Sequence, residues 1–104
     1  MRVACENIIE HDDWLFCYAY VAGQGPLNGT RIMHAWNEKK EWDIVFDFSN
    51  GRTIVKDKKR YYENAKIQEK DITRQNYKEV MELIFKHRTY GGWVKGPMQI
   101  PMKI

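Results

Sequence analysis

The sequence predicts an α+β domain: a short N-terminal helix, a small antiparallel β-meander of three to four strands, and an amphipathic C-terminal helix packed on one face. Two observations support this. Residues 14–48 contain three apolar or alternating stretches rich in aromatic and β-branched side chains, which is typical of strands. Residues 77–85 instead place apolar side chains three and four positions apart, which is typical of a helix.

The length and composition fit a single domain. A chain of 104 residues can form one hydrophobic core, and its 43% hydrophobic and 13% aromatic residues suffice to fill it. We expect this domain to span 1–93. The segment 94–104 contains two prolines and shows no helical period, so we expect an extended C-terminal tail there.

The N-terminal third should contain a helix, a strand and a loop. The first helix is expected at 5–11, and because it is only about two turns long it must be held by packing. The apolar run 14–21 predicts a central strand. Glycine and proline mark 22–29 as a loop.

The stretches 31–36 and 42–48 predict the two arms of a β-hairpin. If the turn is symmetric about residues 40–41, His34 lies directly opposite Asp47. Directly opposed residues have Cβ atoms about 5 Å apart, which allows a carboxylate to hold an imidazole. A slip of one residue would move Asp47 to the other face.

The remaining elements follow this hairpin. A turn at 49–51 leads to a fourth short strand at 53–55, and 60–65 predicts a short helix. Thr73 is expected to cap the C-terminal helix. The apolar stripe of that helix, which we expect to be core, consists of Tyr77, Val80, Met81, Ile84 and Phe85.

Cys5 is the candidate nucleophile. A helix that begins at Cys5 would place its thiol among unpaired backbone N–H groups, which favour the thiolate. His34 would act as the general base, and Asp47 would fix the orientation of its ring. Trp36 shares a face with His34, so it is the candidate substrate-binding residue that excludes water from the pair.

Cys5, His34 and Asp47 each have a purely structural explanation as well. Two cysteines do not form a disulfide framework, and buried cysteines commonly have only a packing role. Cys17 lies inside an apolar strand and is expected to be core, with a fallback role as nucleophile if Cys5 is buried. His34 could equally be a strand histidine that forms a hydrogen bond to a neighbour, and Asp47 could be a carboxylate exposed to solvent.

Several function classes lack support in the sequence. No Cys/His cluster has zinc spacing and no phosphate-binding loop occurs, so we expect neither a metal nor another cofactor. A net charge of +3 is weak evidence for nucleic acid, and the run 56–60 with Tyr61 and Tyr62 is the best candidate for such a patch. No apolar stretch approaches the roughly 20 residues that span a bilayer, so we expect a cytoplasmic protein without a membrane partner. The oligomeric state stays open.

Four short motifs carry a family resemblance. The chain resembles the papain-like and transglutaminase-like cysteine hydrolases, including NlpC/P60 peptidases, and more closely a set of small uncharacterised bacterial and phage proteins. The downstream segments 61–62, 77–85 and 90–93 are similar as well. The four motifs are Cys5 with Asn7, the aromatic strand 16–20, His34-Ala35-Trp36 and Val45-Phe46-Asp47.

The resemblance implies a cysteine hydrolase or acyltransferase that acts on an amide or thioester through Cys5, His34 and Asp47. Phe48-Ser49 follows Asp47 where the resembling proteins usually have Pro-Thr, so a degenerate triad is included in this hypothesis. The alternative is a non-catalytic protein-interaction module on the same scaffold. It would bind a protein or peptide through exposed aromatic side chains, for which the candidates are Trp14, Trp42 and Trp93.

Overall fold

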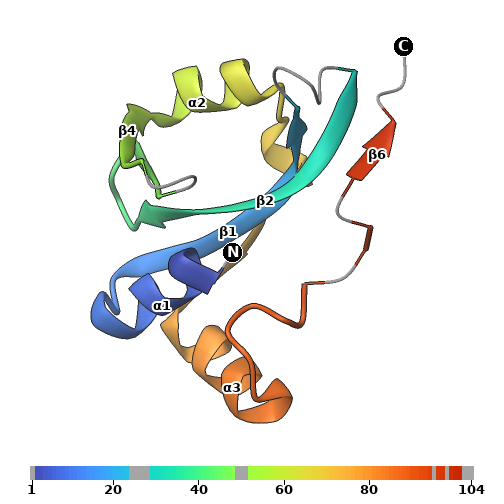
Figure 1. The fold of residues 1–104 in the computed structure, drawn as a ribbon. Helices are drawn as coiled ribbons and strands as arrows, with labels where there is room; N and C mark the ends of the chain where they lie inside the picture. The colour runs from blue at the N-terminus through green and yellow to red at the C-terminus, as the bar shows by residue number, and fades with distance from the viewer. Residues whose placement is uncertain (1, 24–28, 49–51, 95, 98, 102–104) are drawn as a thin grey trace.

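The protein has the α+β fold that the sequence predicts (Figure 1). The structure is a computed structural model that describes residues 2–23, 29–48, 52–94, 96–97 and 99–101. The helices of this part are α1 (Arg2–Glu10), α2 (Lys58–Ala65), α3 (Tyr77–His87) and the short 3-10 helix η3 (Glu69–Asp71). Its strands are β1 (Trp14–Ala22), β2 (Thr30–Lys39), β3 (Ile44–Asp47), β4 (Ile54–Asp57), β5 (Thr73–Gln75) and β6 (Gln99–Pro101).

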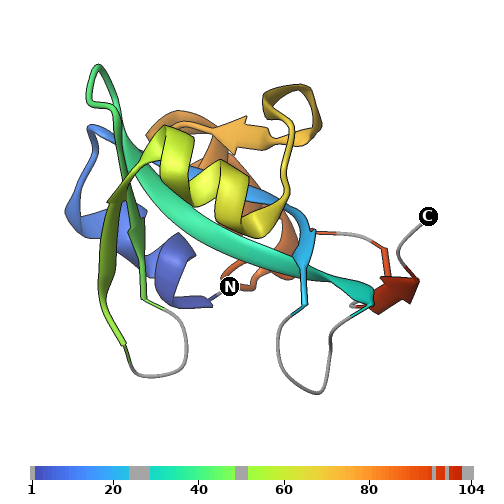
Figure 2. The same ribbon diagram turned by 90° about the horizontal axis from the view of Figure 1, so that it is seen from above.

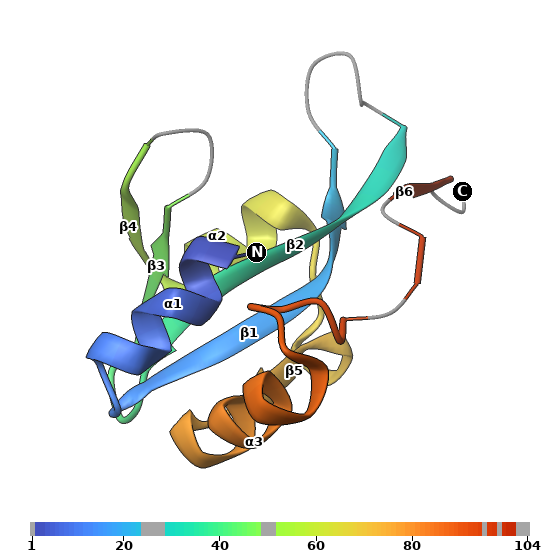
Figure 3. The same ribbon diagram turned by 60° about the horizontal axis from the view of Figure 1, so that its bottom comes forward.

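The strands form one antiparallel sheet in which β1 and β2 are the long central members. The order is β4-β3-β2-β1-β5, and β6 pairs with the start of β2. Figures 2 and 3 show helices on both sides of the sheet. We call the side covered by α1 and α3 the α1 face, and the side covered by α2 the α2 face.

Each face of the sheet has its own hydrophobic core. Successive side chains of a strand point to opposite faces, so neighbouring residues such as Phe16 and Cys17 belong to different cores. The core of the α1 face consists of Ala4, Cys5, Ile8, Phe16, Ala35, Val80 and Trp93. The core of the α2 face consists of Cys17, Ala19, Val21, Trp36, Val45, Tyr61 and Ile67.

The cap of helix α3 lies three residues after Thr73, the predicted cap. Thr73 instead starts β5, and Asn76 caps the helix. The Asn76 side chain accepts a hydrogen bond of 2.9 Å from the Glu79 amide, and the Glu79 carboxylate accepts one of 3.1 Å from the Asn76 amide. This reciprocal capping box satisfies two amides of the first turn, which explains where the helix starts.

The expectation that the whole apolar stripe of α3 is core was wrong. Val80 is fully buried, whereas Tyr77 is 37% exposed and Phe85 is 69% exposed. Val80, Leu83 and Ile84 are the residues of α3 that pack into the core of the α1 face. The helix is therefore rotated so that the rest of its apolar stripe faces solvent.

The part of the tail that the structure describes is tied to the sheet. Strand β6 pairs with residues 30–32 of β2, and the Tyr20 hydroxyl donates a hydrogen bond of 2.7 Å to the carbonyl of Pro97. The predicted turn at 49–51 and the tail residues 102–104 lie outside the described residues, as does most of the predicted loop at 22–29.

Replacing Asn76 with alanine should lower the free energy of unfolding by about 1 kcal/mol, because the Glu79 amide loses its side-chain acceptor, whereas the backbone amide of residue 76 can still donate to Glu79. The urea midpoint of the purified protein measures this change. Asn64→Ala is the matched control, since Asn64 is exposed within α2, and it should leave the midpoint unchanged or slightly raised. Equal losses from both variants would contradict the assigned cap.

Candidate functional site

His34 and Asp47 come together on the α2 face. Nε2 of His34 lies 2.8 Å from Oδ2 of Asp47, and the Tyr61 hydroxyl donates a hydrogen bond of 2.7 Å to the same oxygen. Asp47 is buried and the His34 side chain is partly exposed. This cluster therefore joins β2, β3 and α2 through one carboxylate.

The strand register differs from the predicted one by two residues. The turn closes as expected, because the Trp42 amide donates to the Lys39 carbonyl. The ladder beyond it, however, pairs Asn37 with Phe46, so the β3 arm holds two more residues than a symmetric hairpin would. A register shift of two residues leaves every side chain on the same face of the sheet. His34 therefore still contacts Asp47, but from a diagonal position instead of the directly opposite one.

Tyr61 is the hydrogen-bond donor in its contact with Asp47. Burial and the neighbouring Asp47 charge raise the pKa of Tyr61 well above its ordinary value, so the phenol keeps its proton and donates a hydrogen bond to the carboxylate. Asp47 thus acts as the acceptor for Tyr61 and for Nε2 of His34. Nδ1 is the ring nitrogen of His34 that this carboxylate does not engage.

Cys5 lies on the opposite side of the sheet from this cluster. Its side chain is fully buried in the α1-face core, beside Phe16 and Ala35. Helix α1 already begins at Arg2, so Cys5 lacks the helix-start environment that was expected to lower its pKa. Burial instead raises the pKa of Cys5 to about 11.

Cys17, the fallback nucleophile, lies on the same face as His34 but is fully buried in the α2-face core. It pairs with Trp36 across the β1–β2 ladder. Burial and the nearby Glu38 charge raise its pKa far above the ordinary value of a thiol. The structure therefore brings His34 and Asp47 together with a tyrosine rather than with an accessible thiol.

Trp36, the predicted substrate-binding residue, has no exposed surface. Its ring packs against Tyr61 with centroids 5.4 Å apart, and its indole N–H donates a hydrogen bond of 2.9 Å to Glu38. Trp36 thus lies between the Asp47 cluster and a second buried carboxylate, that of Glu38.

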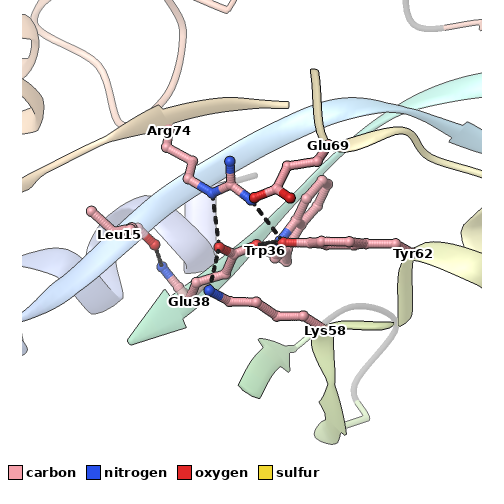
Figure 4. Close-up of polar contacts among 8 residues, drawn as sticks. Leu15, Trp36, Glu38, Lys58, Tyr62, Glu69 and Arg74 are labelled. Atoms are coloured by element: carbon pink, nitrogen blue, oxygen red, sulfur yellow. Dashed lines mark hydrogen bonds and ion pairs between the residues drawn. The ribbon is translucent and has the colours of Figure 1, made fainter. Parts of the chain in front are cut away.

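Glu38 is the centre of a polar network that the sequence analysis missed (Figure 4). Arg74 donates a hydrogen bond of 2.9 Å to its carboxylate, Lys58 forms an ion pair with it at 3.6 Å, and Tyr62 also donates to it. Arg74 also contacts Glu69 at 3.2 Å. The network links β2 to α2, η3 and β5.

The Glu38 carboxylate is buried yet ionised. Burial alone would raise its pKa, but hydrogen bonds from Tyr62, Trp36 and Arg74 outweigh that effect and hold the pKa below its usual value. The missed signal was strand alternation. The predicted arm ends at residue 36, whereas β2 continues to Lys39, so Glu38 points to the same face as His34 and Trp36.

The two tyrosines of the proposed basic-aromatic patch bind to buried carboxylates of the protein itself. Their hydroxyls donate to Asp47 and Glu38, and the Tyr61 ring is buried. Among the described residues no three His, Cys, Asp or Glu side chains are placed to hold a metal ion. None of the helices in that part of the chain is long and apolar enough to span a membrane.

Comparison with known proteins does not place the chain in a family. No protein-family model matches the chain, and neither the curated proteins nor the solved structures contain a match. The resemblance to papain-like and NlpC/P60 hydrolases therefore stays a prediction.

Replacing Glu38 with glutamine should lower the free energy of unfolding by about 3–5 kcal/mol near neutral pH, because Arg74 and Lys58 lose their buried counter-charge. A lowered pKa in the folded state stabilises the fold above the ordinary Glu pKa, and this stabilisation is lost as the pH falls through the folded value. The penalty should therefore shrink between about pH 7 and about pH 3, as measured by urea unfolding.

Glu69→Gln is the control for this prediction. Glu69 contacts the same Arg74 but is 72% exposed, so its replacement should change stability by no more than about 0.5 kcal/mol. A Glu38→Gln penalty that is equally large at both pH values would contradict an ionised Glu38.

Proposed function

We propose that the protein is a non-catalytic interaction module whose buried polar clusters hold its fold together. The observation that carries the proposal is the position of Cys5, on the other face of the sheet from His34. A thiol–imidazole mechanism requires the nucleophile within hydrogen-bond reach of its base. Moving Cys5 across the sheet would require α1 to leave its core.

The chemistry of both thiols supports the same proposal. The thiolate is the reactive form, and burial raises the pKa of Cys5 and of Cys17. Both side chains are also fully buried, so a substrate carbonyl has no access to either sulfur. These features are typical of cysteines that serve as small apolar core residues.

The His34–Asp47–Tyr61 cluster has a structural explanation. A buried carboxylate is costly unless hydrogen bonds satisfy it, and here an imidazole and a phenol from two other elements do so. Exposed apolar side chains, by contrast, are available on several elements. The largest are Val3, Ile9, Trp42, Val55, Tyr77, Phe85 and Tyr90.

The hydrolase hypothesis and this proposal make opposite predictions for the thiols. We expect iodoacetamide to label both cysteines of the folded protein slowly at neutral pH, at a rate that His34→Ala leaves unchanged. Unfolding in urea should raise both rates toward those of a free thiol, whose pKa is about 8.5. Mass spectrometry of the digested protein assigns the label to each site.

Asn64→Ala serves as the variant control, because it alters an exposed position of α2 that belongs to neither core. Rapid labelling of Cys5 in the folded wild type, lost in His34→Ala but kept in Asn64→Ala, would overturn the proposal. That result would restore the hydrolase as the leading hypothesis.

A further inference from the structure

The outer edge of β4 is the end of the sheet in the part of the chain that the structure describes. β4 pairs with β3 on one side only, and Figure 3 shows it at the margin of the sheet. An unpaired edge offers rows of backbone N–H and C=O groups to which another strand can bind.

The pairing pattern identifies which groups face outward. The Lys58 amide donates to the Asp43 carbonyl, so these two residues form a hydrogen-bonded pair of the β3–β4 ladder. Such pairs alternate along antiparallel strands, so Lys56 is bonded to β3 and Val55 is not. The N–H and C=O of Val55 therefore point away from the sheet.

Side chains beside this edge are apolar on one face. Val55 is 55% exposed and pairs with Phe46, whose ring stacks on Trp14 with centroids 4.6 Å apart. Asn37, which also pairs with Phe46, bonds to α1 through the Ala4 carbonyl, so this apolar surface belongs to the α1 face.

The same edge is strongly basic. Residues 52–60 contain five basic side chains and one acidic side chain, Asp57. Lys56 and Lys59 are exposed and form no ion pair with the residues the structure describes, whereas Lys58 is held by Glu38. A segment lying along β4 therefore meets a positive field.

We propose that β4 binds an acidic, extended segment of a partner protein, which adds a strand to the sheet. The inference rests on the proposed function as an interaction module. An apolar side chain of the partner lies opposite Val55 and extends the surface of Phe46, and a carboxylate meets Lys56 on the α2 face. The outward N–H and C=O of Val55 supply a pair of backbone hydrogen bonds.

Two other occupants fit the edge less well. A second copy of the chain, related by a two-fold axis at Val55, would bring two such basic segments together, and edge lysines are a common device against this pairing. Single-stranded nucleic acid needs open ring faces for stacking. Near this edge Trp14 covers Phe46, and Lys39 lies over Trp42 at 3.9 Å.

The test uses a fluorescein-labelled peptide of alternating glutamate and valine with blocked ends, and measures binding by fluorescence anisotropy. We expect saturable binding that weakens with salt, and no binding of the peptide with lysine in place of glutamate. Val55→Pro removes the outward N–H without removing a β3–β4 bond, and it should weaken binding at least tenfold. Lys56→Glu keeps the backbone intact and should also weaken binding several-fold.

Amide hydrogen exchange of the wild type gives a readout that does not depend on a variant. The peptide should slow exchange at the Val55 amide while leaving the Lys56 amide, already bonded to β3, nearly unchanged. Phe85→Ser is the matched control, because it removes an exposed apolar side chain on α3, and it should bind the peptide like the wild type.

Several outcomes would overturn the inference. They are the absence of saturable binding up to about 1 mM, self-association that Val55→Pro abolishes, and preferential binding of oligothymidylate. Equal binding by wild type and Val55→Pro would also remove β4 as the site but leave the interaction module standing. The module itself fails only through the thiol-labelling result, so the two failures are distinguishable.

Discussion

The alternation of side chains along β2 is the constraint on which the rest of the structure depends. Five consecutive residues, 34–38, send their side chains alternately to the two faces. His34, Trp36 and Glu38 meet α2, while Ala35 and Asn37 meet α1. Because a strand cannot present adjacent residues to one side, any group on α1 is separated from His34 by the thickness of the sheet.

Two polar residues of β2 anchor the two helical layers. On the α1 face, the buried Asn37 amide donates to the carbonyls of Ala4 and Leu15 and accepts from Asn7. On the α2 face, Glu38 performs the same role with charged partners. The Asn7 that contributed to the family resemblance therefore has a structural task, since it satisfies a buried amide whose unpaired groups would cost stability.

The sequence predicted elements well where local pattern decides them, and contacts less well where long-range packing does. The prediction that His34 and Asp47 lie on the same face of the sheet was correct, but the predicted register was wrong by two residues. Two additional residues beside the turn do not disturb the alternation of apolar and polar residues in the arms, so the sequence pattern could not reveal them. The face that α1 covers depends on the path of the chain after β1, so the separation of Cys5 from His34 could not be derived. Three-residue strands such as β5 are too short to show a period.

The charged groups of the buried polar clusters and those of the edge strand differ in their partners. Glu38 and Asp47 are buried and committed to internal partners, and their hydrogen bonds stabilise the fold whatever lies outside. Lys56, which follows Val55 in β4, and Lys59, in the first turn of α2, form no ion pair with the residues that the structure describes. In the proposed complex, these charges and the outward backbone groups of Val55 together select a partner segment that is both acidic and extended.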